Sequence, residues 1–312
     1  MALLNFRKPD PRGMAGPDPK VVALMQGYSI EVMPRTARKI DDFRALLPAG
    51  TRVYVAHIEG TPIDEMIDTA RRLTDDGFCA MPHIVARNIP SRAALAEWIS
   101  RYRNEAGVRQ ALLLAGGAKV PHGPFDSSLQ MMETGLFDKA GFDRLHVAGH
   151  PEGNRDIDPD GGHANVEAAL RWKQAFSERS DAEMAIVTQF VFEAQPIIDW
   201  ADAIRAAGIH MPVHVGLAGP AKLQTLIKYA IACGVGPSLS VLQKRAMDVT
   251  KLLLPYEPAD VASALAAHKA AHPDSNIALV HMFPLGGIGP AADWALDNSG
   301  AEAQARMKGG VA

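Results

Sequence analysis

The chain has 312 residues, of which 47% are apolar and 21% are charged. This is the composition of an ordinary globular protein that can bury a large core. The formal net charge is −3 and no long run of Lys and Arg occurs. Duplex nucleic acid is therefore not expected as a partner, because phosphate binding needs a concentrated basic face. The two cysteines, Cys79 and Cys233, are too few for a disulfide scaffold or a cysteine-based zinc site and indicate a reducing compartment.

The first residues, MALLNFRKPDPRGMAGPDPK, combine a short apolar run with several Pro and Gly residues. No basic region precedes that run, so a signal peptide is not expected, and no stretch reaches the roughly 18 apolar residues of a membrane span. We therefore expect a cytoplasmic protein without membrane contact. Residues 1–24 are expected to form a mobile N-terminal extension, and residues 25–312 a single domain.

Short apolar runs alternate along the chain with longer amphipathic segments. Among the amphipathic segments, PSRAALAEWISRYRNEAG offers Ser91 as a helix N-cap. QPIIDWADAIRAAG has the N-terminal Pro and C-terminal Gly that are typical of a helix. The apolar runs predict strands at residues 27–33, 51–58, 77–85, 108–116, 144–152, 182–192, 211–218 and 276–283.

Eight strands that are each followed by a helix predict an α/β fold, a single (β/α)8 TIM barrel. Their continuous apolar character fits strands that are buried on both faces. A doubly wound open sheet is the alternative, which the strand count and the missing Gly-rich phosphate loop disfavour. The chain between Gly219 and Asn276 is longer than one helix requires. PSLSVLQKRAMDVTKLL, at residues 237–253, is therefore expected to be an extra helical excursion before the last strand.

In such a barrel, catalytic side chains gather at the C-terminal ends of the strands. Glu31 follows the apolar residues YSI, so its carboxyl group is expected to enter a largely apolar barrel mouth. Burial without a cation raises the pKa of a carboxyl group, which suits a general acid near neutral pH. A structural ion pair with Arg35 is the alternative. The other candidates at strand ends are His57, Glu59, His83, Gly116, Gly117, His150, Glu152, Gln189 and His281.

The histidines raise the question of a metal centre. No H-E-x-x-H motif is present, and the acidic residues lack the spacing of a metal-binding helix, so no metal site is expected. His146 and His214 lie inside their strands and are expected to be core residues. A metal-dependent hydrolase that uses strand-end histidines is kept as an alternative. The histidines considered are His57, His83, His146, His150, His163, His214 and His281.

Two glycines and one glutamine at strand ends each allow two interpretations. Gly116 and Gly117 either let a ligand approach the backbone closely or form a flexible turn. Gln189 lies in AIVTQFVF, where a purely structural strand would carry Val or Ile. Because a primary amide both donates and accepts hydrogen bonds, it matches a heterocycle such as a pterin. A hydrogen bond to the neighbouring backbone is the alternative role of this amide.

The strand ends resemble those of the methylenetetrahydrofolate reductase family. YSIEVMP is similar to the first strand of that family, PHIV to the third, and VAGHPEG to the fifth. IVTQFVFE is similar to the sixth strand, and AAGIHMPVHVGLAGPAKL to the seventh with its following loop and helix. The resemblance runs over residues 27–285. Its most specific part is T-Q-F-x-F combined with A-G-I and a G-L turn at the right distance.

The resemblance implies a barrel enzyme that reduces 5,10-methylenetetrahydrofolate to 5-methyltetrahydrofolate, a step of one-carbon metabolism and methionine biosynthesis. Glu31 matches the glutamate that protonates a folate nitrogen and opens the five-membered ring to an electrophilic iminium. Gln189 matches the glutamine that contacts the pterin. Further substrate contacts are expected from Phe192, Leu223 and Phe283. In typical members the hydride reaches the iminium carbon from FAD that a nicotinamide has reduced.

The chain departs from the family at the flavin contacts. Typical members have an R-G-D-like run after the fourth strand, whereas residues 115–117 are Ala-Gly-Gly. Ala56 stands in place of a threonine that touches the flavin, His150 in place of a tyrosine, and Leu223 in place of an aromatic residue. Losing two charge-assisted hydrogen bonds of roughly 1.5–3 kcal/mol each weakens binding by orders of magnitude. We therefore predict a divergent reductase that binds FAD weakly or not at all and transfers hydride directly from NAD(P)H.

The ligands expected from the resemblance are a small-molecule folate and NAD(P)H. No oligomeric state is predicted. Three alternatives remain open: the usual FAD-dependent enzyme, the reverse oxidation of 5-methyltetrahydrofolate, and a non-catalytic barrel that binds a folate or a corrinoid-linked partner. The residues expected to contact the cofactor are His57, His83, Gly116, Gly117, His150, Glu152 and Lys173.

Overall fold

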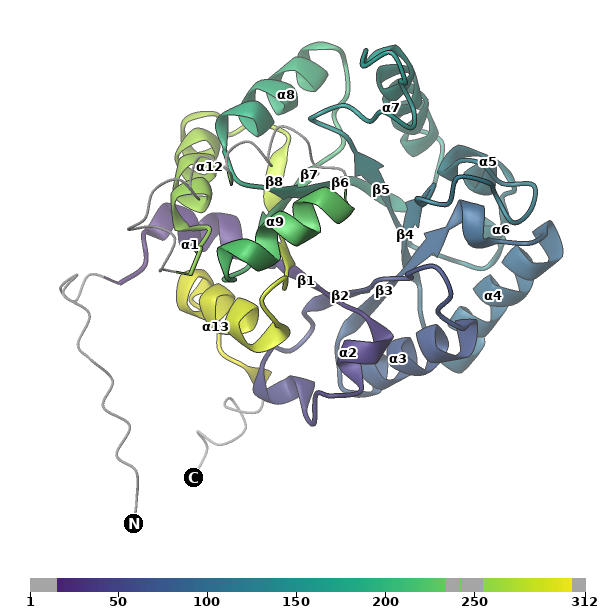
Figure 1. Cartoon of the computed structure of the whole chain (residues 1–312), viewed down its shortest axis with the longest axis horizontal. Coiled ribbons are helices and arrows are strands. Elements are labelled where there is room, and N and C mark those ends of the chain that lie inside the picture. The colour runs from purple at the N-terminus through teal and green to yellow at the C-terminus, as the bar shows by residue number, and fades with distance from the viewer. Residues whose placement is uncertain (1–15, 234–241, 243–254, 305–312) are drawn as a thin grey trace.

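The computed structural model describes residues 16–233, 242 and 255–304 of the chain. Eight parallel strands close into a barrel in chain order, with the first strand paired to both the second and the eighth (Figure 1). The predicted (β/α)8 barrel is confirmed, and each strand lies inside the run predicted for it. The strands are β1 Ser29–Val32, β2 Arg52–Val55, β3 Cys79–Val85, β4 Gln110–Leu114, β5 Arg144–Gly149, β6 Glu183–Val191, β7 Val213–Ala218 and β8 Ile277–Phe283.

Helices surround the barrel as an outer ring (Figure 1). The Ser91 hydroxyl accepts a hydrogen bond from the Ala94 backbone N–H at 3.0 Å, which confirms the predicted cap of the helix after β3. No helix within the described ranges is long and apolar enough to cross a membrane. The helices are α1 Pro19–Met25, α2 Pro34–Ala37, α3 Ile63–Asp75, α4 Arg92–Glu105, α5 Ser128–Glu133, α6 Leu136–Lys139, α7 Ala164–Ser177, α8 Gln195–Ala206, α9 Leu223–Ala232, α12 Ala259–Ala271 and α13 Ile288–Ser299.

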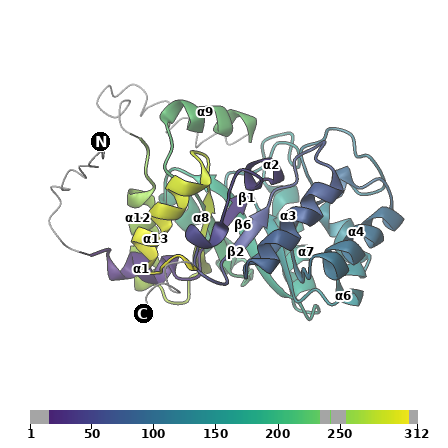
Figure 2. The same cartoon turned by 90° about the horizontal axis from the view of Figure 1, so that it is seen from below.

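The two ends of the barrel carry different helices, as Figure 2 shows. Helix α1 packs at the N-terminal end against α12 and α13, with Val21, Leu24 and Met25 buried. The domain boundary expected at residue 24 therefore falls inside this helix. Helix α9 lies over the C-terminal end, where the strand-end candidates are. The helical excursion expected at 237–253 lies outside the described residues except for Leu242, which is buried.

The barrel interior is more polar than its strand sequences suggest. Tyr54, Met81, Leu112 and Val187 form a small cluster apart from the large core between strands and helices. Buried polar side chains share this interior because strand residues alternate between the two faces of a sheet. They are Ser29, His146, His214 and His281, all with less than 5% of their surface exposed.

Candidate functional site

Glu31 and His83 form an acid–imidazole pair at the C-terminal end of the barrel. The Glu31 Oε2 atom lies 3.3 Å from His83 Nε2, and the Glu31 side chain keeps 20% of its surface exposed. Strand alternation positions Glu31, because Ser29 two residues earlier faces the barrel interior and bonds His281. The carboxylate partner is thus His83 from β3, and not Arg35 from the neighbouring helix α2. A carboxyl group in this place can exchange a proton with a ligand in the barrel mouth.

His57 lies near this pair, but its side chain stabilises the loop that follows β2. Its Nε2–H donates to the Thr61 backbone carbonyl at 3.0 Å, and its ring packs beside Trp98 with centroids 5.9 Å apart. Burial lowers the pKa of His57, while the bond to Thr61 opposes this and the charge of His83 adds to it. Because one ring nitrogen serves the β2–α3 loop, only Nδ1 of His57 is left for a ligand.

Gln189 lies at a bulge in β6. The register against β7 shifts between Val187 and Phe190, so that two residues of β6 lie opposite one residue of β7. The Thr188 hydroxyl accepts from the Gly216 N–H at 2.9 Å and donates to the Gln189 carbonyl at 2.9 Å. The Gln189 Oε1 atom accepts from the Phe190 N–H at 3.1 Å. The predicted alternative, a hydrogen bond to the neighbouring backbone, is therefore correct for the amide oxygen. The amide nitrogen of Gln189 has no hydrogen-bond partner within the described part of the chain and can donate to a ligand.

The three apolar residues expected at the substrate differ in their surroundings. Phe192 and Leu223 are 6% and 2% exposed, and they belong to an apolar cluster between the strand ends and α9. Phe283 is half-buried, with its ring centroid 5.5 Å from that of Phe190 and 4.8 Å from that of His281. Of the three, Phe283 alone combines a place at the barrel mouth with partial exposure.

Cys233 ends helix α9, which lies over the C-terminal end of the barrel. It is the C-cap of that helix and is exposed. Its thiol is therefore accessible to solvent.

Gly116 and Gly117, after β4, have different structural requirements. Gly116 has φ +95°, and a Cβ atom there would lie 2.3 Å from Val85 Cγ1. Gly117 has open space around the position of a Cβ atom. Arg87 holds this loop, because its guanidinium donates to the Ala118 carbonyl at 3.2 Å and to Asp126 at 3.0 Å. Turn geometry thus explains Gly116, whereas nothing in the fold requires a glycine at 117.

Separate alanine variants of these glycines distinguish a structural from a binding role. Gly116→Ala should lower the free energy of unfolding by about 1–3 kcal/mol, because it forces a left-handed φ and a steric clash. Gly117→Ala should leave stability unchanged and raise KM for NAD(P)H if a dinucleotide approaches the backbone there. Urea unfolding and steady-state kinetics measure the two effects. Equal stability of both variants would contradict the structural role of Gly116. An unchanged KM in Gly117→Ala would contradict the binding role of Gly117.

A second polar group lies at the end of β5, which is opposite β1 in the closed barrel. The Lys173 ammonium donates to the Ala148 carbonyl at 2.8 Å, and burial lowers the pKa of this lysine to about 8. Burial, with the charge of Lys173 as the second cause, lowers the pKa of His150 to about 4. His150 is therefore neutral near pH 7, and Lys173 is bound to the strand backbone. Glu152, two residues after His150 in the chain, is half-buried.

The histidines do not assemble a metal centre. Among the described residues, no group of three or more His, Cys, Asp or Glu side chains has the geometry to hold a metal ion. His146 and His214 are buried in the barrel interior, as expected from their positions in the strands. Tyr54, which contacts His83 and His146, was not among the candidates from the sequence. The sequence feature that could have indicated Tyr54 is the occurrence of polar residues at every second position in otherwise apolar strands.

No family model matches the chain. Among solved structures, it is similar to an uncharacterized protein from Clostridium thermocellum that binds two copies of 5-methyl-5,6,7,8-tetrahydrofolic acid. That similarity has a TM-score of 0.55 and 11% identity and covers 89% of this chain and 96% of the other. The chain also matches Yersinia pestis DHPS with a pterine–sulfa conjugate at a TM-score of 0.43 and 11% identity, over 89% and 94% of the two chains. At 11% identity, the likeness to the Clostridium thermocellum protein shows the fold alone.

Proposed function

We propose that this protein binds a reduced folate at the C-terminal end of its barrel and interconverts 5,10-methylenetetrahydrofolate and 5-methyltetrahydrofolate with NAD(P)H. The observation that carries the proposal is the common location of Glu31 and Gln189. Glu31 and the amide nitrogen of Gln189 belong to the same end of the barrel, and neither is consumed by a structural hydrogen bond. The motif resemblance, and the methyltetrahydrofolate bound by the Clostridium thermocellum protein, support a folate in this place.

In the proposed reaction Glu31 gives its proton to the folate nitrogen that leaves the methylene bridge. The bridge carbon becomes an iminium, and hydride from the nicotinamide adds to it to form the methyl group. His83, 3.3 Å from the carboxyl group, stabilises the carboxylate that remains. Gln189 donates to an acceptor atom of the pterin and orients the ring. One proton and one hydride are added, which balances the reduction.

The residues at the flavin positions do not fit FAD, so no step is assigned to a flavin. Arg87 contacts the β4 loop, and its guanidinium binds Asp126 and the carbonyls of Gly116 and Ala118. Lys173 is bound to Ala148 and buried. Neither side chain is free to replace the missing arginine against a pyrophosphate. This arrangement supports our proposal that hydride comes directly from NAD(P)H.

The proposal is tested by the purified protein with methylenetetrahydrofolate and either NADH or NADPH. We expect nicotinamide oxidation to be coupled to formation of 5-methyltetrahydrofolate, without the visible absorbance band of a flavin. A stoichiometric flavin band would favour the FAD-dependent alternative. Folate binding without nicotinamide oxidation would favour a non-catalytic barrel. Absence of both folate binding and turnover would contradict the proposal.

Gln189→Ala should weaken folate binding by roughly tenfold, because it removes a hydrogen bond of about 1–1.5 kcal/mol to the pterin. The expected change in kcat is smaller than the change in affinity. Isothermal titration calorimetry with 5-methyltetrahydrofolate measures the dissociation constant. Equal affinity of the variant and the wild type would contradict the contact.

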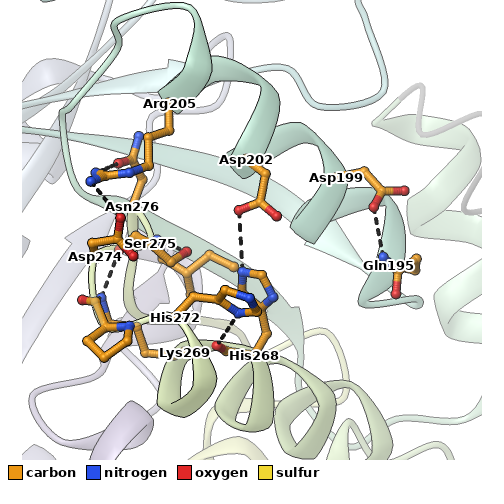
Figure 3. Close-up of polar contacts among 12 residues, drawn as sticks. Gln195, Asp199, Asp202, Arg205, His268, Lys269, His272, Asp274, Ser275 and Asn276 are labelled. Carbon is orange, nitrogen blue, oxygen red and sulfur yellow. Dashed lines mark hydrogen bonds and ion pairs between the residues drawn. The ribbon is translucent and has the colours of Figure 1, made fainter.

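Gln195→Ala is a matched control for that variant. Gln195 lies at the start of α8, where its amide nitrogen donates to Asp199 at 2.7 Å (Figure 3). Figure 3 also shows Asp202 of α8 facing His268 of α12, so this helix face is bound to its neighbour and not to the barrel mouth. The same loss of an amide should therefore leave folate affinity unchanged.

A further inference from the structure

A buried polar network lies directly below the Glu31–His83 pair, and Tyr54 is its centre. The Tyr54 hydroxyl is hydrogen-bonded to His146 Nδ1, and its ring centroid lies 4.3 Å from that of His281. His281 Nδ1 is 2.9 Å from Ser29 Oγ, and the rings of His146 and His214 are 4.7 Å apart. The network thus joins strands β1, β2, β5, β7 and β8 inside the barrel.

The network is an unusual filling for a barrel interior. Interiors of such barrels are usually filled by branched aliphatic side chains. Burial lowers the pKa of His146, His214 and His281, so all three are neutral near pH 7. One nitrogen of each ring has no hydrogen-bond partner in the described part of the chain, which is unfavourable for a buried polar group. Polar residues kept at such a cost are typical of a functional constraint.

Tyr54 connects the network to the site. On β2 it pairs in register with Glu31 of β1, and its ring forms a T-shaped contact with the His83 ring, at an interplanar angle of 82° with centroids 6.2 Å apart. His83 in turn lies 3.3 Å from the Glu31 carboxylate. The phenol ring of Tyr54 thus contacts the His83 imidazole, which in turn faces the Glu31 carboxylate.

We infer that Tyr54 is a positioning residue for the Glu31–His83 pair, a role whose catalytic consequence rests on the proposed function. The hydrogen bond to His146 fixes the phenol ring, the ring fixes the His83 imidazole, and His83 fixes the carboxyl group toward the barrel mouth. Tyr54 transmits geometry and carries no proton to the site, because its contact with His83 is between rings.

The first test uses the full-length protein and needs no activity. The ¹³Cε1–¹H signal of His83 reports the charge beside its ring, so Glu31→Gln should shift it in the wild-type background. In the Tyr54→Phe background, Glu31→Gln should shift the His83 signal by less than about half of the wild-type shift. The reason is that Glu31 and His83 are no longer held in one fixed geometry. An equal shift in both backgrounds would overturn the inference. If Tyr54→Phe does not fold, His146→Leu removes the same hydrogen bond and should have the same effect.

The second test is kinetic and includes a control with the same chemical change. Tyr54→Phe should lower kcat for methylenetetrahydrofolate roughly ten- to a hundredfold with little change in KM, since a small displacement of a reacting group has such an effect. Tyr102 is equally buried, its hydroxyl has no partner in the described residues, and it packs in α4 outside the barrel interior. Tyr102→Phe should leave kcat unchanged.

The two tests separate failure of the inference from failure of the proposed function. A wild-type protein that does not reduce methylenetetrahydrofolate would contradict the proposed function, while the His83 signal would still decide the positioning role. An active wild type with Tyr54→Phe as active as Tyr102→Phe would overturn the inference and leave the proposed function intact.

Discussion

Replacing Glu31 by Gln is expected to lower kcat for methylenetetrahydrofolate reduction by about 10²–10⁴-fold, the usual contribution of general acid catalysis. The amide keeps the shape of the side chain and its place 3.3 Å from His83, but it has no acidic proton for the folate nitrogen. Folate affinity should therefore change little. Steady-state kinetics and calorimetric titration with 5-methyltetrahydrofolate measure the two quantities separately.

Glu59→Gln is the matched control for this variant. Glu59 follows β2 at the same end of the barrel and lies 3.5 Å from His122 Nε2, with both side chains more than half exposed. An exposed pair of this kind contributes little, so kcat should remain close to the wild-type value. A fully active Glu31→Gln protein would show that the acid has been assigned to the wrong residue.

Acidification is expected to unfold the protein steeply below pH 6.5. Burial lowers the pKa of His146, His214 and His281, to about 3 for His214, whereas the same residues titrate near 6.5 in the unfolded chain. Below pH 6.5 the unfolded state therefore binds protons that the folded state does not accept. Each such histidine lowers the free energy of unfolding by about 1.4 kcal/mol per pH unit, so the three together give about 4 kcal/mol per unit. Because domains are stable by only about 5–15 kcal/mol, a fall of this size leaves little stability two to three pH units below 6.5.

His214→Leu should reduce this slope by about 1.4 kcal/mol per pH unit, because it removes one of these groups. Urea unfolding followed by circular dichroism between pH 5 and pH 7.5 measures the slope. Met81→Leu, in the same interior and not titratable, should change stability by a similar amount at every pH and leave the slope intact. A His214→Leu protein with the wild-type slope would show that this histidine is protonated in the folded state.

Several features of the fold could be predicted because they depend on neighbours in the chain. Continuous apolar runs separated by amphipathic segments indicated eight strands, and each was found inside its predicted range. Ser91 caps α4 because the Ser hydroxyl reaches an N–H only three residues away. The strand-end rule then placed Glu31 and Gln189 at one end of the barrel.

Contacts between strands could not be predicted in the same way. The sequence offered Arg35 as the partner of Glu31, four residues away, whereas the barrel brings His83 from β3. It treated Gly116 and Gly117 alike, although the turn requires a positive φ at Gly116. The sequence likewise did not indicate that Lys173, predicted to contact a ligand, donates to the Ala148 carbonyl of β5.

The sequence by itself determined the barrel, its strand order and the side chains at its C-terminal end, because local periodicity and capping fix each element. Only the tertiary structure decided which of these side chains meet. The Ser29–His281 contact joins residues 252 positions apart, and Tyr54 pairs with His146 across 92 positions. Such contacts depend on strand register and on closure of the sheet. Neither is encoded in the composition of a single strand, because a shift of one residue exchanges the two faces of the sheet.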